Sequence, residues 1–537
     1  MKYLHYIYTF LFGVAVLLFF GLVYPHHLHY QEQYQLFLFD STYVWDIVRL
    51  PGGVADLLGR FCTQFFLYAW VGALIIALLL SAVQLLTLRL VSYQLSIIHY
   101  PLLYALSFVP SFLLWLFLLD ENALLGGVWA VLLTLIASWL MSWSFGRLVV
   151  WSFGGWGKKL RLILLIVAIP ILYWIAGPIC VVFFLLQVLN NKRSVSSQSS
   201  KFFAEQSGKA ERKVQSSIVL LVLLAIMLLI LPSYLPVPSR SLWFGIHYHR
   251  YPTVIPVLLW SAALSVFVLA LIARFCNKPA TSKSQNLKTI LLCVLCFLCG
   301  LCAVWKYSNF KAEKVMQYDF MARHQHWNRI LATVNAEKPN NQIGVTVQNL
   351  ALGMHGLLAD HLFEFNQNGI LGLLPDVQSD ATSPLPTAEA FYQLGMINVA
   401  QRTVFECQEA ILDFQKSGRC YKRLAQTNLI NGNYEVARKY LTALQKTLFY
   451  REWANETLQL LGNEKAIAQH PEYGRLRQFA YNQDYYFSDH VTPEMLESLY
   501  YGNTDNRLAL EYLKAYYMLT GDREGYNKLL RELGVKN

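Results

Sequence analysis

Residues 66–88 read FLYAWVGALIIALLLSAVQLLTL, a stretch without a charged side chain that is long enough to cross the hydrocarbon core of a bilayer as a helix. Stretches of the same kind recur up to Trp305, and none follows after Lys306. Hydrophobic residues make up 55% of the 537-residue chain and charged residues only 14%, a balance that excludes an ordinary soluble protein. The sequence therefore predicts an all-α protein, with a polytopic transmembrane helix bundle over 1–305 and a water-soluble domain over 306–537.

Seven apolar stretches predict simple spans, whereas the apolar stretch 160–190 is too long for one. It is interrupted by Pro170 and by Gly177-Pro178. If it crossed once, the basic loop 192–213 would lie outside, against the rule that Lys and Arg collect on the cytoplasmic side. We therefore expect a helical hairpin, spanning or re-entrant, that turns at Gly177-Pro178, and about nine membrane segments in all. The simple spans are 3–24, 66–88, 101–119, 123–143, 217–235, 253–273 and 289–305.

The loops between the spans orient the bundle. Arg89 and the stretch 158–161 are basic and belong on the cytoplasmic side, whereas the turn 120–122 (Asp-Glu-Asn) is acidic and faces outward. The N-terminus is then cytoplasmic, 25–65 and 236–252 are outer loops, and the C-terminal domain is extracytoplasmic. The sequence thus predicts a multi-pass protein of the bacterial inner (plasma) membrane with a periplasmic tail. These loops explain much of the net charge of +11, so nucleic acid is not expected as a partner.

After Lys306 the pattern changes to helix pairs of about 30–40 residues, with a small residue or a turn between the helices. In the run 431–437, Asn-Gly-Asn supplies a turn, Tyr434 an aromatic plug and Ala437 a small packing residue. This is typical of a tetratricopeptide-like α-solenoid, whose concave face binds a peptide, a partner protein or part of the same chain. We therefore expect a binding domain, and no enzyme chemistry follows from it.

Two groups of cysteines raise the question of metal or disulfide chemistry. The four cysteines of 293–302 recur at every third position, which spreads them along about 13 Å of helix instead of around one metal, so we expect packing residues. Cys407 and Cys420 lie in the tail, which we place in an oxidising compartment. A helix turn near 417–418 would set their α-carbons too far apart to bridge, so we expect free thiols.

The first outer loop contains a histidine-rich stretch. His26, His27, His29 and Glu32 have the residue types of a metal site, but Tyr and Gln interleave them and no turn geometry brings them together. Histidines at a membrane surface explain the same residues. We therefore expect no metal and no cofactor.

Charged residues of the outer loops are candidates for catalysis. The layout, with a large first outer loop and a soluble C-terminal domain, is similar to that of membrane glycosyltransferases that use lipid-linked sugars. The resemblance implies a catalytic carboxylate in the first outer loop and a phosphate clamp from later loops. The paired acidic motif at the end of the first span is missing here, and ordinary loop polarity explains the same residues. The candidates are Asp40 and Asp46 as the base, Arg49 beside them, and Arg240, His247, His249 and Arg250 as the clamp.

Distinctive strings occur in both halves of the chain. The first outer loop has YQEQYQLFLF at 30–39 and Pro-Gly-Gly at 51–53, and the tail has NLAL at 349–352 and NLINGNYEVARKY at 428–440. With these strings the chain resembles, over nearly its whole length, an uncharacterised bacterial family catalogued as domain of unknown function 6057. The resemblance implies the same architecture and supplies no activity, cofactor or catalytic residue.

Three functions remain open from the sequence. The first is an envelope scaffold in which the bundle anchors a helical-repeat platform for a protein or peptide partner. The second is the lipid-linked-sugar glycosyltransferase, so whether the protein is an enzyme stays open. The third is a transporter, because a hairpin broken at 177–178 is similar to the discontinuous helices of transporters, although charge inside the spans is nearly absent.

Overall fold

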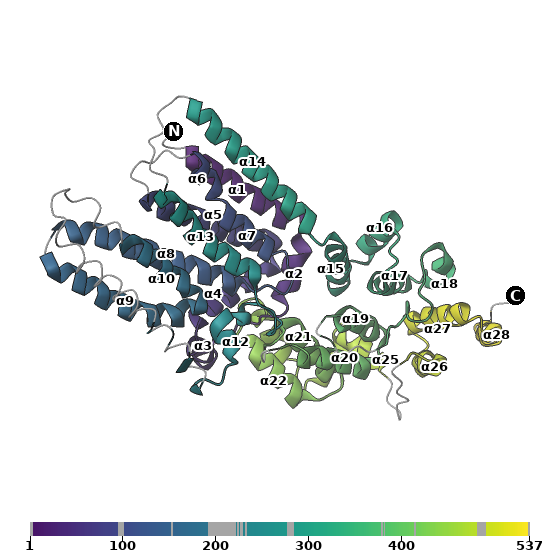
Figure 1. Ribbon diagram of the computed structural model, residues 1–537. Coiled ribbons are helices and arrows are strands. Elements are labelled where there is room, and N and C mark those ends of the chain that lie inside the picture. The colour runs from purple at the N-terminus through teal and green to yellow at the C-terminus, as the bar shows by residue number, and fades with distance from the viewer. Residues whose placement is uncertain are drawn as a thin grey trace. The chain divides into compact units, whose positions relative to one another are not determined.

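The computed structural model describes residues 4–94, 101–151, 154–191, 233–275, 284–376, 382–412, 415–480 and 490–534, with a few isolated positions between them. Within these ranges the regular elements are helices, and no β-strand is present. The chain divides into two compact units (Figure 1), which are Met1–Gln31 with Asp40–Asn309, and Glu32–Phe39 with Phe310–Asn537. We call them the membrane unit and the helix-pair unit. A short piece of the first loop belongs to the second unit.

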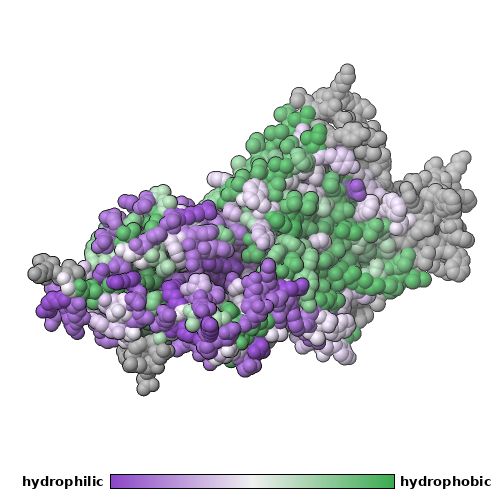
Figure 2. Space-filling model, turned by 180° about the vertical axis from the view of Figure 1, so that it is seen from behind, coloured by the Kyte–Doolittle hydropathy of each residue, from purple (hydrophilic) through white to green (hydrophobic). Residues whose placement is uncertain are grey.

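The membrane unit contains six helical stretches that are long and apolar enough to cross a membrane, in agreement with the predicted bundle. Hydrophobic side chains cover the face of this unit seen in Figure 2, whereas hydrophilic side chains dominate the helix-pair unit. Such an apolar surface suits contact with lipid and would be penalised in water. Most of the predicted span 217–235 lies outside the described residues, and so does the whole basic loop 192–213. The six stretches are His5–Val23, Ala69–Gln94, Leu125–Ser144, Ile163–Asn190, Val257–Phe275 and Ile290–Tyr307, and Leu102–Phe117 is a shorter one.

The helices of the membrane unit are α1 (Leu4–Leu18), which continues as a π-helical turn at Phe19–Val23, α2 (Pro25–Glu32), α3 (Ser41–Val48), α4 (Gly53–Thr63), α5 (Ala69–Gln94), α6 (Pro101–Leu106), α7 (Val109–Phe117), α8 (Leu125–Trp151), α9 (Gly154–Ala176), α10 (Val181–Asn191), α12 (Ser239–Phe244), α13 (Val257–Phe275) and α14 (Ser284–Tyr307). Short 3₁₀ turns occupy Gln64–Leu67, Gly177–Cys180 and Ile246–Tyr248.

Polar side chains inside the membrane unit find partners on neighbouring helices. Gln84 of α5 accepts a hydrogen bond of 2.7 Å from Thr9 of α1 and donates one of 2.9 Å to Ser107, which lies between α6 and α7. Ser111 of α7 donates to the carbonyl of Leu80 at 2.8 Å. Because an unpaired polar group is costly in hydrocarbon, these bonds favour one arrangement of α1, α5 and α7.

The apolar stretch 163–190 contains a reversal of the chain. Gly177, between α9 and α10, lies against Gly52, whose N–H donates to carbonyls at the end of α9. At the other end of α10, Asn190 donates to Ser142, which lies toward the end of α8. Since α9 begins close after α8 and runs back to Gly177, α9 and α10 are antiparallel (Figure 1). These contacts agree with the expected hairpin, and the positive φ of 61° at Gly177 is a conformation that glycine adopts without strain.

The first loop, the acidic turn and the end of α14 share one end of the bundle. The backbone N–H of Asn309, just after α14, donates to the hydroxyl of Tyr24, just after α1, at 3.1 Å. Gln31, in the first loop, donates to the carbonyl of Ala123, beside the acidic turn, at 3.1 Å. The chain therefore leaves the membrane unit at the end of the bundle where α1 finishes.

The helix-pair unit is built from short helices joined by tight turns, and several of these turns carry a glycine with positive φ, such as Gly395 at 90° and Gly432 at 78°. Its helices are α15 (Phe310–Arg323), α16 (Trp327–Glu337), α17 (Gln342–Met354), α18 (Leu358–His361), α19 (Pro384–Leu394), α20 (Ile397–Glu409), α21 (Gly418–Ile430), α22 (Tyr434–Gln445), α23 (Arg451–Leu458), α24 (Glu464–Gln469), α25 (Tyr473–Phe479), α26 (Pro493–Gly502), α27 (Arg507–Thr520) and α28 (Arg523–Glu532), with a 3₁₀ turn at Leu362–Glu364.

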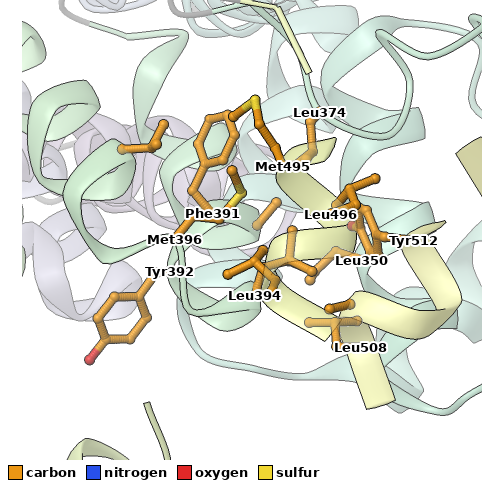
Figure 3. Close-up of a cluster of buried hydrophobic side chains, with 14 of the residues drawn as sticks. Leu350, Leu374, Phe391, Tyr392, Leu394, Met396, Met495, Leu496, Leu508 and Tyr512 are labelled. Atoms are coloured by element: carbon orange, nitrogen blue, oxygen red, sulfur yellow. The ribbon is translucent and has the colours of Figure 1, made fainter. Parts of the chain in front are cut away.

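One buried cluster joins distant helices of this unit. Figure 3 shows Phe391 and Leu394 of α19 together with Leu496 of α26 and with Leu508 and Tyr512 of α27. These side chains are at most 7% exposed. Burying apolar groups from helices that are far apart in the sequence in one core links the helix pairs into a single folded unit.

Residues Glu32–Phe39, which we call the strap, run through the helix-pair unit and are not helical from Gln35 onward. The backbone N–H of Leu36 donates to the carbonyl of Lys416 at 3.0 Å, and that of Phe39 donates to Lys446 at 2.7 Å. The side chain of Leu36 is 8% exposed and packs among residues of α21, α22 and α23. Main-chain hydrogen bonds combined with a side-chain pocket are a common way for a domain to hold a peptide.

Charged groups also fix the strap. The carboxylate of Glu32 accepts a hydrogen bond from the hydroxyl of Tyr450 at 2.9 Å and lies 3.6 Å from the guanidinium of Arg323. Gln33 accepts a hydrogen bond of 3.1 Å from Arg419, whose guanidinium also binds both carboxylate oxygens of Asp319. A buried charge needs partners of this kind, and the strap supplies part of them.

Candidate functional site

The two carboxylates that were candidates for a catalytic base have partners in α3 or directly after it. Asp40 precedes α3 and accepts a hydrogen bond of 2.9 Å from the backbone N–H of Thr42, so it caps the helix. Asp46 lies 3.1 Å from Arg49, and these side chains are 61% and 56% exposed. Exposed pairs of this kind are solvated and contribute little energy. Helix capping and a surface ion pair account for the positions of all three candidates.

His249 and Arg250 connect loops at the end of the bundle. One ring nitrogen of His249 lies 3.0 Å from the carboxylate of Asp120, and Arg250 donates to the hydroxyl of Tyr30 at 3.2 Å. Burial works against the charged carboxylate, but hydrogen bonds from His249 and Asn122 lower the pKa of Asp120 below its ordinary value. These contacts attach the acidic turn and the first loop to the segment around His249. Arg240, in α12, is exposed.

A largely buried ion pair that was not among the predicted site residues lies on α4. The carboxylate of Asp56 lies 2.8 Å from one terminal nitrogen of Arg60 and accepts a hydrogen bond of 3.0 Å from its Nε, and the side chains are 14% and 16% exposed. The hydroxyl of Tyr43, on α3, is hydrogen-bonded to the same guanidinium. Burial opposes the charge of Arg60, but Asp56 and Tyr43 outweigh it and raise its pKa.

His247 and Tyr248 lie beside this pair, and the five residues together are called the polar centre here. Nε2 of His247 and the hydroxyl of Tyr248 are buried and have no hydrogen-bond partner among the described residues. A Cβ added to Gly52 would lie 2.6 Å from the Tyr248 hydroxyl and 2.8 Å from His247 Nε2, so both atoms point at this glycine. Burial lowers the pKa of His247 to about 4, an effect that the charge of Asp56 partly opposes. The polar centre thus offers a neutral imidazole and a phenol next to an ion pair, groups that can hold a water or a polar ligand.

The residues considered for metal binding are the histidines of the first loop and the cysteines of α14. His27 is fully buried, and one ring nitrogen lies 2.9 Å from the carbonyl of Leu118. On α14, Cys293 is buried while Cys299 and Cys302 are exposed. Across the described part of the chain, no group of three or more His, Cys, Asp or Glu residues is arranged for a metal ion.

Cys407 and Cys420 are neighbours, and the separation expected from the sequence is wrong. The expectation placed a direct helix turn near 417–418, but α20 ends at Glu409 and α21 begins at Gly418. Cys407 therefore lies at the end of one helix and Cys420 in the first turn of the next. Both side chains are fully buried and belong to one cluster.

A groove of about 640 Å³ opens at the turns of the helix-pair unit. Asn431 donates a hydrogen bond of 2.8 Å to Asn398 at its wall. Arg477 donates to the carbonyls of Leu429 and Ile430 at 2.9 and 3.0 Å, and it pairs with Glu464. These bonds hold the turn before α22 in place. The groove is lined by Gly395, Met396, Ile397, Asn398, Ile430, Asn431, Gly432, Asn433, Tyr434, Glu464, Arg477, Ala480 and Leu499.

Comparison with known proteins gives one family. A family model described as "Family of unknown function (DUF6057)" matches residues 1–536. The chain belongs to this family. No curated protein and no solved structure matches the chain.

The DUF6057 match spans both units, so the polar centre and the groove both lie in the region that defines the family. Of the five residues of the polar centre, only His247 was predicted from the sequence, and Tyr43, Asp56, Arg60 and Tyr248 were missed. Asp56 and Arg60 are four residues apart on one helix, the spacing at which opposite charges pair, and this was the signal available for them.

Proposed function

We propose that this DUF6057 protein is a membrane-anchored scaffold of the cell envelope whose helix-pair unit binds a partner protein or peptide. In this proposal the membrane unit lies in the bacterial inner membrane with its N-terminus in the cytoplasm. The helix-pair unit is then a tetratricopeptide-like solenoid on the periplasmic side. The groove at the helix turns is the observation that carries the proposal.

The groove has the chemistry of a peptide site. Its walls carry the exposed amides of Asn398, Asn431 and Asn433, and its lining includes the apolar side chains of Ile397 and Leu499. An asparagine amide both donates and accepts hydrogen bonds, so it matches the N–H and C=O groups of a peptide main chain. Apolar lining supplies the affinity that polar contacts alone lack in water.

The strap supports the same role. It is an eight-residue stretch of chain that the helix-pair unit holds through backbone hydrogen bonds, an apolar pocket and a buried carboxylate. Helix-pair arrays bind peptides in the same way, by combining main-chain contacts with pockets. Because the strap occupies its own position along α21 to α23, the groove at the turns stays available for a second occupant.

A charge placed in the groove tests the proposal. Asn398→Arg adds a long cation at the groove wall, and Asn527→Arg makes the same change on the exposed surface of α28. In cells that depend on the gene for growth under envelope stress, we expect Asn398→Arg to abolish complementation and Asn527→Arg to preserve it, at equal amounts of membrane-inserted protein. Full complementation by Asn398→Arg would show that the groove is not the functional site.

A second function, glycosyl transfer from a lipid-linked donor, is supported by the polar centre. Asp56 is a carboxylate on a helix of the first loop, with Arg60 and His247 near it, which is the set of groups that such a reaction uses. Asp56→Asn and Asp46→Asn are the matched pair of variants, because only the former alters the polar centre. Loss of complementation with Asp56→Asn alone, with insertion and thermal stability retained, would favour the enzyme over the scaffold.

A further inference from the structure

The helix-pair unit contains only two of the nine cysteines of the chain, Cys407 and Cys420. Both are 0% exposed and lie in one cluster with Leu385, Ala388, Val404 and Leu424. The thiol of Cys420 is hydrogen-bonded to that of Cys407. Two cysteines in direct contact, one at the end of α20 and one at the start of α21, have the placement that a cross-link between these helices requires.

The surroundings of Cys420 favour its reactive form. Ser417 caps α21 and accepts a hydrogen bond of 3.2 Å from the backbone N–H of Cys420. Burial alone would raise the pKa of the Cys420 thiol, but hydrogen bonds to Cys407 and Ser417 and the charges of Arg419 and Arg323 lower it. The thiolate is the species that attacks a disulfide, so these contacts favour attack by Cys420.

We propose that Cys407 and Cys420 form a disulfide bond in the mature protein, which ties the end of α20 to the first turn of α21. The proposal rests on the proposed placement of the helix-pair unit outside the cytoplasm, where thiol oxidants keep such bonds formed. The bond would stabilise the segment next to the strap, because Gly418 packs against Leu36 and Arg419 binds Gln33.

The oxidant is a protein or small molecule that carries a reactive disulfide. The Cys420 thiolate attacks one sulfur of this disulfide, and the other sulfur leaves as a thiolate. The Cys407 thiolate then attacks Sγ of Cys420 and releases, as a thiolate, the oxidant sulfur that was bonded to it. The two cysteine thiols lose two protons and two electrons in total, and the oxidant gains them as it becomes a dithiol. Because both thiols are fully buried in the folded unit, the reaction takes place during folding or while the unit is locally open.

Mass spectrometry of the full-length protein tests the bond directly. Protein isolated from membranes is denatured in N-ethylmaleimide, so that every free thiol is blocked, and is then digested with and without prior reduction. We expect a peptide pair joined through Cys407 and Cys420 in the unreduced digest, and Cys62 alkylated in the same sample. Recovery of Cys407 and Cys420 with maleimide on both sulfurs, without reduction, would overturn the proposal.

A second measurement separates this outcome from a wrong compartment. Asn527→Cys, on the exposed surface of α28, is labelled in intact cells with a maleimide that cannot cross the inner membrane. If Asn527→Cys is labelled while Cys407 and Cys420 are found as free thiols, the disulfide is rejected and the extracytoplasmic placement stands. If Asn527→Cys is labelled only after the membrane is opened, the extracytoplasmic placement is rejected, and the disulfide with it. A thermal shift on adding dithiothreitol, absent in Cys407→Ala, provides an independent readout of the bond.

Discussion

The hydroxyl of Tyr450 donates a hydrogen bond of 2.9 Å to the carboxylate of Glu32, a residue 418 positions earlier in the chain. Glu32 is 6% exposed, and Arg323 lies 3.6 Å away from the same carboxylate. A charge this deeply buried is stable only with such partners. The strap is therefore a component of the helix-pair unit, although it is encoded in the loop after the first span.

Glu32→Gln is expected to destabilise the helix-pair unit, because it keeps the size of the side chain but removes the carboxylate charge paired with the largely buried Arg323. Breaking a buried pair from one side costs about 3–5 kcal/mol. Hydrogen exchange of α21 to α23 in the full-length protein measures the loss. Glu435→Gln, at a side chain that is 88% exposed, is the control and should change the free energy of unfolding by less than about 0.5 kcal/mol. Equal protection in both variants would contradict the role assigned to Glu32.

The fragment 310–537 lacks the strap and is expected to be less stable than the same unit in the full chain. Without the strap, the pocket of Leu36 and the guanidinium of Arg323 lose their partners. A synthetic peptide of residues 30–41 should raise the melting temperature of the fragment, since a ligand of the folded state stabilises it by about 2.7 kcal/mol at 100 times its Kd. The same peptide with Leu36→Asp is the control. A fragment that melts like the intact unit and ignores the peptide would show the strap to be dispensable.

Gly52→Ala is expected to destabilise the membrane unit by two separate effects. Its φ of 77° costs an alanine about 1–2 kcal/mol, and its Cβ would press on the Tyr248 hydroxyl and on His247. Gly432→Ala isolates the first effect, because its φ is 78° and its Cβ would meet nothing within 4 Å. Thermal unfolding of both variants in detergent should show the larger loss for Gly52→Ala. Similar losses of stability in the two variants would mean that the side chains of the polar centre move to make room for an added methyl group.

The apolar helices were predictable because hydrophobicity over consecutive residues is enough to define a span. The turn at Gly177-Pro178 was predictable for a related reason, since proline and glycine interrupt helices locally and the basic loop after them limits the topology. Both signals lie within a few residues of the feature that they predict.

The strap and the polar centre depend on contacts between distant residues, and no local pattern encodes those. Nothing in the stretch 32–39 shows that Glu32 meets Tyr450, although a segment of the same chain was one of the occupants expected for the array. The Asp56–Arg60 spacing predicts a pair but not its burial, which comes from packing α4 against α8. The error over Cys407 and Cys420 had a similar origin, because their distance depends on where α20 ends.

Acidification is expected to destabilise the membrane unit through His27. This side chain is fully buried, and burial lowers its pKa to about 4, against about 6.5 in an unfolded chain. Between these values the unfolded state binds a proton that the folded state does not, so the free energy of unfolding falls as the pH drops from about 6.5 to 4. The full shift corresponds to about 3 kcal/mol.

Thermal unfolding in detergent across this pH window checks the effect of His27. In His27→Gln the side-chain amide can still donate to the carbonyl of Leu118 but does not titrate, so its stability should fall less on acidification than that of the wild type. His355→Gln, at an exposed position of the helix-pair unit, should keep the wild-type slope. The comparison is needed because other groups titrate nearby. The pKa of Asp120 is lowered in the folded state, so the stability that its charge contributes is lost only as the pH falls below the ordinary range of a carboxyl group. A wild-type slope in His27→Gln would assign the acid sensitivity to those groups instead.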